Sequence, residues 1–155
     1  MISWLKDTCS KLPQKYTNIL MFNTLTGLRP SEAYLSISLI QDNLEHYLNN
    51  DTKILEHFRF PAFIRRTKKA YISFINDRIL EMARSVRRQL ITYNQLKLQF
   101  KRHSINAIHM LYCRKIFATY LRLSGIEQET IDLLQGRIPR NVFVRHYFRP
   151  SFAMR

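Results

Sequence analysis

Hydrophobic residues recur at helical spacing, every third or fourth position, through most of the chain. Near the N-terminus the spacing breaks at Pro13, as expected of a residue that lacks a backbone donor. After residue 76 the apolar stripe alternates with polar faces, which is typical of helices packed on one side of a core. The pattern predicts helices over residues 1–26 (interrupted at Pro13), 77–93, 94–103, 104–123 and 127–134.

Two residues mark a junction between helices near position 29. Gly27 suits the C-terminal end of one helix, and Pro30 suits the first turn of the next. The residue before a proline is disfavoured in the α conformation. Arg29 is therefore expected to present a guanidinium held in a fixed direction.

Strand character is confined to the middle of the chain. Residues 34–60 are irregular: 34–40 read either as a helix end or as a short strand, with a break at 49–51. Residues 60–64 and 71–75 are β-prone, and the basic run 65–70 (RRTKKA) lies between them. We expect a hairpin with a basic tip. The predicted class is thus mainly α with a small β-hairpin or three-stranded sheet.

Charge is distributed unevenly. The chain has 155 residues, enough for one domain, and a formal net charge of +14. Residues 1–60 hold 6 Lys/Arg and 6 Asp/Glu, so the remaining 19 Lys/Arg and 5 Asp/Glu place the whole +14 in residues 61–155. Such a field implies an anionic partner, with nucleic acid as the first choice and an inert basic surface as the alternative.

Several classes are disfavoured by the remaining composition. Two cysteines make no disulfide framework, and Cys113 fits a small buried residue in a reducing compartment. Five scattered histidines predict no zinc site. No apolar run reaches a membrane span and no signal peptide is evident, so we expect a soluble, intracellular protein.

Candidate chemistry lies in the C-terminal third. Arg114 interrupts an apolar helical run, Arg137 follows a glycine, and Tyr147 stands beside Arg145 and His146. A tyrosine hydroxyl has a pKa of about 10, and neighbouring cations favour its phenolate and neutralise a phosphate under attack. Further residues predicted to contact a DNA backbone are Arg65, Arg66, Arg84, Arg87, Arg88 and Arg145, although ordinary solvent-exposed faces show the same pattern.

Two motifs resemble those of the tyrosine recombinase (phage integrase) family. TGLRPSE at 26–32 resembles the first arginine motif, and CRKIFATYL at 113–121 resembles the second. LLQGR at 133–137 stands where the family often has L-G-H. Tyr147 follows Arg137 by ten residues, within about one residue of the position expected for the nucleophile. The overall pattern is similar to archaeal integrases of the fusellovirus type.

This resemblance implies residue roles. Arg29, Arg114 and Arg137 would hold the scissile phosphate, Glu32 would hold the local helix in place, and Tyr147 would attack. A hairpin lysine would act as general acid: Lys68 is the first choice and Lys69 the alternative.

The chain departs from the family pattern beside the second arginine. Leu111 and Lys115 stand at positions that are usually His. Lys115, Tyr112 or His109 would replace the missing function, or the hairpin lysine would act without help.

The resemblance further implies site-specific recombination through a 3′-phosphotyrosyl link, with neither cofactor nor metal. Double-stranded DNA carrying an attachment site would be the partner, in the cytoplasm of a host cell, with a homotetramer on DNA and a monomer allowed in its absence. Residues 1–155 would form a single catalytic domain that lacks the N-terminal DNA-clamping domain. Three alternatives remain: DNA relaxation of the type IB topoisomerase kind, a non-catalytic DNA-binding protein with a degenerate recombinase fold, and a basic RNA-binding or structural protein.

Overall fold

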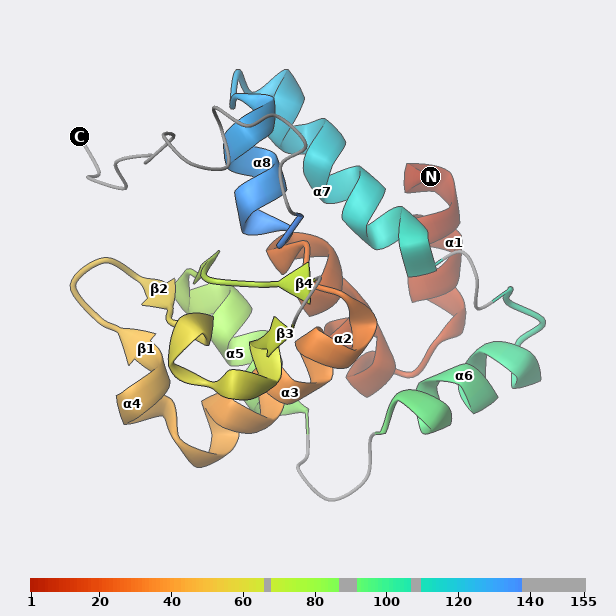
Figure 1. The fold of residues 1–155 in the computed structure, drawn as a ribbon. Coiled ribbons are helices and arrows are strands. Elements are labelled where there is room, and N and C mark those ends of the chain that lie inside the picture. The colour runs from red at the N-terminus through yellow and green to blue at the C-terminus, as the bar shows by residue number, and fades with distance from the viewer. Residues whose placement is uncertain (66–67, 87–91, 107–109, 138–155) are drawn as a thin grey trace.

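The computed structural model describes residues 1–65, 68–86, 92–106 and 110–137, and of Lys68 only the backbone. It is mainly helical with small antiparallel sheets, which agrees with the predicted class (Figure 1). The helices are α1 Ile2–Lys11, α2 Gln14–Thr26, α3 Pro30–Asp42, α4 Leu44–Tyr47, α5 Asp77–Ser85, α6 Tyr93–Arg102, α7 Leu111–Leu123 and α8 Gln128–Leu134, with short 3-10 helices η1 His57–Arg59 and η2 Pro61–Phe63.

Helix α2 forms the centre of the core. It packs against α1, α3, α5 and α7, and Figure 1 shows these helices around it. Ile19, Leu20 and Phe22 on this helix are completely or almost completely buried. Buried residues recur along most of α2, so this helix is covered from several directions at once.

The predicted breaks between the first helices are confirmed. Helix α1 ends before Leu12, and Pro13 caps the start of α2. Gly27 ends α2 with a backbone φ of +66°, a left-handed conformation that glycine adopts without steric penalty. Arg29 follows in an extended conformation as the N-cap of α3, and Pro30 occupies the first turn.

Strands β1 Leu48–Asn49, β2 Ile54–Leu55 and β5 Ser73–Phe74 form a three-stranded antiparallel sheet in the order β1-β2-β5. Strands β3 Ile64–Arg65 and β4 Lys68–Lys69 form a separate hairpin. The predicted hairpin is present, but its predicted strands were wrong. Residues 61–63 are a 3-10 turn, since Pro61 cannot donate to a ladder, and β5 pairs with β2 instead.

Two helix predictions also need correction. The helix expected over 77–93 ends at Ser85, where the Gln41 side chain donates to the carbonyls of Ala83 and Val86. Tyr93 belongs to the following helix, which begins behind a Thr92 capping box. The helix expected over 104–123 is not formed at residues 104–106, and α7 is described from Leu111 onward. Residues 34–40, for which a helix end or a short strand was expected, lie wholly inside helix α3.

Burial varies along α7. Tyr120 is 68% exposed, whereas Cys113 is fully buried as predicted. Both cysteines are free. Within the described part of the chain, no helix is long and apolar enough for a membrane span, and no group of acidic, His and Cys side chains could hold a metal ion.

Candidate active site

The first arginine is placed by a short loop whose backbone is tightly held. Asn23, which is 1% exposed, donates from Nδ2 to the carbonyl of Leu28 at 2.5 Å. The backbone of Gly27 lies against the ring of Phe117, so closely that a side chain at position 27 would overlap it. The loop between α2 and α3 is therefore fixed from within by α2 and from outside by α7.

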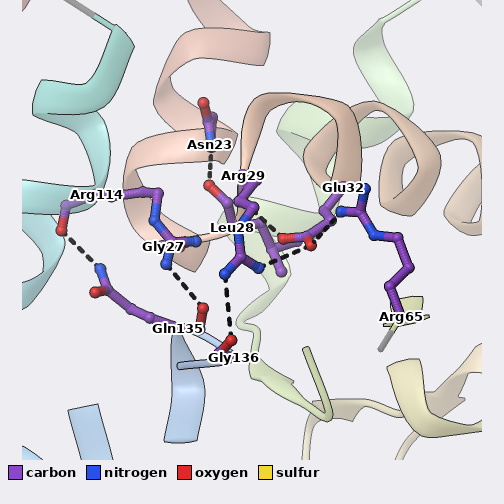
Figure 2. Close-up of polar contacts among 9 residues, drawn as sticks. All are labelled: Asn23, Gly27, Leu28, Arg29, Glu32, Arg65, Arg114, Gln135 and Gly136. Carbon is purple, nitrogen blue, oxygen red and sulfur yellow. Dashed lines mark hydrogen bonds and ion pairs between the residues drawn. The ribbon is translucent and has the colours of Figure 1, made fainter. Parts of the chain in front are cut away.

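Glu32 binds two arginines at once. Its Oε1 accepts from Arg29 Nη1 at 2.9 Å and from Arg65 Nη2 at 2.8 Å, while Oε2 accepts from the Arg29 backbone N–H at 2.9 Å (Figure 2). Glu32 is 2% exposed. Burial alone would raise the pKa of its carboxyl, but the backbone N–H and the charge of Arg29, together with the hydrogen bond from Arg65, outweigh burial and lower the pKa below its ordinary value. Glu32 is thus a buried carboxylate that fixes both guanidinium groups.

Arg114 joins three segments distant in sequence. Its Nη1 donates to the Gly27 carbonyl at 2.9 Å and its Nη2 to the Gln135 carbonyl at 2.8 Å. The Gln135 side chain donates back from Nε2 to the Arg114 carbonyl at 2.7 Å (Figure 2). Backbone carbonyls from two loops thus accept hydrogen bonds from both terminal nitrogens of this partly buried arginine.

The end of α8 meets both Arg29 and the β3–β4 hairpin. Arg29 Nη2 donates to the Gly136 carbonyl at 3.2 Å. Gly136 has a φ of +61°, and a Cβ built on it would lie 2.6 Å from the Lys69 carbonyl oxygen. Lys69 itself is partly buried. The segment that leads to Arg137 is therefore in direct contact with the strand that carries Lys68 and Lys69.

Arg137 lies beside these two arginines at the surface. Its guanidinium pairs with Asp132 at 3.1 Å and is 47% exposed. Burial, followed by the charge of Arg29 and in part that of Arg137, lowers the pKa of Arg114 to about 10, against the opposing influence of Glu32. The charges of Arg29 and Arg137 thus disfavour the charged form of Arg114, and a bound anion would offset their effect.

The other predicted residues are placed less centrally. Lys115 is exposed, with its Nζ 5.6 Å from the Tyr112 ring centroid. Leu111, at the position usually occupied by His, is 56% exposed. Arg84 is exposed near the end of α5. Tyr147, His109, Arg66, Arg87, Arg88 and Arg145 lie outside the described residues.

Sequence reasoning missed two residues of the site. No local sequence pattern indicated Asn23, because its hydrogen bond to the Leu28 carbonyl forms only once the chain has turned at Gly27. Gln135 stands beside the glycine of the third motif, but its pairing with Arg114 spans 21 residues. Arg65 was predicted to face DNA, and its link to Glu32 was not anticipated.

Fold and site together define the class: a mainly helical domain with arginines gathered at the junctions of its helices. The model of the archaeal phage integrase family matches residues 10–152, nearly the whole chain. The chain belongs to this family, which confirms the resemblance seen in its motifs. No curated protein and no solved structure matches it.

Proposed function

We propose that this chain is a site-specific DNA recombinase that cleaves and rejoins strands through a 3′-phosphotyrosyl intermediate. Membership of the archaeal phage integrase family indicates an integrase role. The chemistry proposed here goes further and assigns each step to a residue. Double-stranded DNA carrying an attachment site is the proposed substrate, and a homotetramer on DNA is the proposed working assembly.

In the proposed reaction, Tyr147 attacks the scissile phosphorus as the phenolate. The new bond joins its oxygen to phosphorus while the bond from phosphorus to the 5′-oxygen breaks. The departing oxygen takes a proton from the ammonium of Lys68, with Lys69 as the alternative donor. Attack by a 5′-hydroxyl of a second strand reverses these steps, so the energy of the broken bond is retained in the tyrosyl link.

Arg29, Arg114 and Arg137 would bind the phosphate and stabilise the extra negative charge of the pentacoordinate transition state. A guanidinium carries five N–H donors. Among the described residues, each of the two terminal nitrogens of Arg29 and of Arg114 donates one hydrogen bond. The remaining N–H groups of both guanidinium groups can therefore donate to a phosphate. These fixed positions cost little reorganisation when the charge develops.

The observation that carries this proposal is the joining of three motifs into one site. Arg114 binds the loop before Arg29 and the loop before Arg137, and Arg29 binds the second of these loops as well. Three cations gathered at these loops favour an anion that can accept two hydrogen bonds from one guanidinium, such as a phosphodiester.

Covalent trapping tests the proposal. The protein is incubated with a duplex selected for binding and nicked so that the short 5′-hydroxyl fragment diffuses away after cleavage. We expect a denaturation-resistant protein–DNA band that is abolished in Tyr147→Phe and reduced at least about a hundredfold in Arg114→Ala. Unimpaired duplex binding without any band from the wild type would favour the non-catalytic DNA-binding protein instead.

A further inference from the structure

A buried histidine lies under the base of the β3–β4 hairpin, outside the arginine cluster. His57 is fully buried, as is Tyr47, and Ser73 is 2% exposed. The Tyr47 hydroxyl lies 2.5 Å from His57 Nδ1, and the Ser73 hydroxyl lies 2.8 Å from His57 Nε2. Both ring nitrogens are thus engaged by hydroxyl groups from different elements.

The hydrogen-bond chain has one consistent direction. Tyr47 donates its single proton to Ser36 Oγ at 2.8 Å, so its oxygen accepts from Nδ1–H of His57. Nε2 of the ring then accepts from the Ser73 hydroxyl. This arrangement requires the neutral imidazole, and burial lowers the pKa of His57 to about 3, so the ring stays neutral.

The same ring also contacts the segment that enters the hairpin. His57 stacks on Phe63 with ring centroids 4.5 Å apart and an interplanar angle of 25°. Phe63 immediately precedes β3, and its carbonyl accepts from the Ala70 N–H at 3.2 Å, directly after β4. Ser73 begins β5, three residues beyond Ala70. One imidazole therefore holds both the incoming and the outgoing segments of the hairpin.

We infer that His57, oriented by Tyr47 and Ser73, is a positioning residue for the hairpin lysine that protonates the leaving 5′-oxygen. This inference rests on the proposed function. Proton transfer needs the ammonium within hydrogen-bond reach of the leaving oxygen, so a small displacement of β4 slows the step strongly. Loss of the His57 contacts releases the base of β4, and the contacts described for His57 itself do not include the arginines that bind the phosphate.

A sulfur substitution isolates this proton transfer. When sulfur replaces the bridging 5′-oxygen of the scissile phosphate, a thiolate leaves without needing a proton, because thiols are far more acidic than alcohols. A defect in general acid catalysis is therefore relieved on the sulfur substrate. A defect in folding, phosphate binding or the nucleophile persists on both substrates.

Single-turnover cleavage is compared for His57→Gln, for the milder Ser73→Ala, and for Lys68→Ala and Lys69→Ala. Ile19→Val on α2 serves as the control, because it lowers stability by about 1 kcal/mol and replaces none of the residues that contact His57. We expect His57→Gln and Ser73→Ala to slow cleavage of the ordinary substrate by roughly tenfold or more, with most of the loss recovered on the sulfur substrate. Ile19→Val should leave both rates unchanged.

Equal slowing of His57→Gln and Ser73→Ala on the two substrates would overturn the positioning role, as would full activity on both. If neither lysine variant recovers on the sulfur substrate, the hairpin lysine is not the acid, and the general-acid assignment fails together with the inference. Recovery of one lysine variant without recovery of the His57 and Ser73 variants contradicts the inference alone. Ser73→Ala retains the imidazole and its stack on Phe63, so the test stands even if His57→Gln fails to fold.

Discussion

Arg114 and Gln135 bind each other in both directions. The guanidinium of Arg114 donates to the backbone carbonyl of Gln135 at 2.8 Å, and the side-chain amide of Gln135 donates to the backbone carbonyl of Arg114 at 2.7 Å. Gln135 is 1% exposed. The pair connects α7 to the end of α8, so the position of one arginine depends on an amide that has no chemical role of its own.

Replacing Gln135 by Leu therefore should reduce catalysis while the chain remains folded. Leucine keeps the volume but loses the donor, and a displacement of Arg114 by about 1 Å costs roughly a hundredfold in rate. The measurement is single-turnover cleavage beside circular dichroism. A rate within about twofold of wild type would show that the backbone carbonyl of residue 135 suffices.

Glu32 makes a contribution to stability that depends on pH. We expect Glu32→Gln to lower the free energy of unfolding at pH 7 by roughly 2 to 3 kcal/mol, because Arg29 and Arg65 lose their shared carboxylate. The folded-state pKa of Glu32 is depressed, so the stabilisation is complete above the ordinary pKa of 4.5 and disappears as the pH falls through the lower folded value. Urea denaturation at pH 7 and pH 3 measures this difference, which should shrink in acid.

Protonation of His57 should also destabilise the fold, in a higher pH range. The neutral ring is favoured in the folded protein, whose His57 pKa is about 3, whereas the unfolded chain binds a proton near pH 6.5. Stability is complete above pH 6.5 and falls by up to about 1.4 kcal/mol per pH unit below it. The negative charge of Glu32 opposes this lowering of the His57 pKa. The pKa of the Glu32 carboxyl itself is lowered below its ordinary value of 4.5.

Urea midpoints at pH 7.5, 6 and 5 compare wild type with His57→Gln. The variant should start less stable at pH 7.5 and show a flatter dependence on pH. Parallel curves for the two proteins would contradict the assignment of this pH range to His57.

Gly136 and Gly125 provide a matched pair of substitutions. Both have positive φ, +61° and +85°, but a Cβ meets the Lys69 backbone at Gly136 and nothing within 4 Å at Gly125. Gly125→Ala should cost about 1 kcal/mol from its backbone conformation. Gly136→Ala should cost roughly 1 to 3 kcal/mol more, because the overlap displaces either β4 or the end of α8.

Thermal unfolding of both variants, with single-turnover cleavage in parallel, measures this difference. Since Gly136 also accepts from Arg29, its variant should lose activity as well as stability. Equal losses of stability in the two variants would show that the hairpin can move aside without cost.

Local signals predicted much of this structure. Gly27 and Pro30 marked a helix junction through backbone preferences that act within a few residues, so Arg29 was correctly placed at the start of α3. Cys113 was correctly expected to be a small buried residue. These features depend on neighbours in sequence.

What sequence reasoning missed depends on distant partners. At the end of α5, the side-chain amide of Gln41 donates hydrogen bonds to the carbonyls of Ala83 and Val86, although Gln41 lies more than 40 residues away in sequence. Strand β5 pairs with β2 rather than with the residues before β3, since the turn at Pro61 removes that alternative. Glu32 was expected to support α3, but its bond to Arg65 required knowledge of where the hairpin lies.

The most direct test of the central proposal identifies the atom that holds the DNA. The covalent complex is trapped on the nicked duplex, digested with trypsin and nuclease, and analysed by mass spectrometry. Cleavage after Arg145, with the Arg149–Pro150 bond resistant, yields residues 146–155 as a peptide with one tyrosine, Tyr147. We predict a 3′-phosphoryl nucleotide on this peptide. A nucleotide on a peptide that contains another tyrosine, or no modified peptide from a protein that binds the duplex, would contradict the proposal.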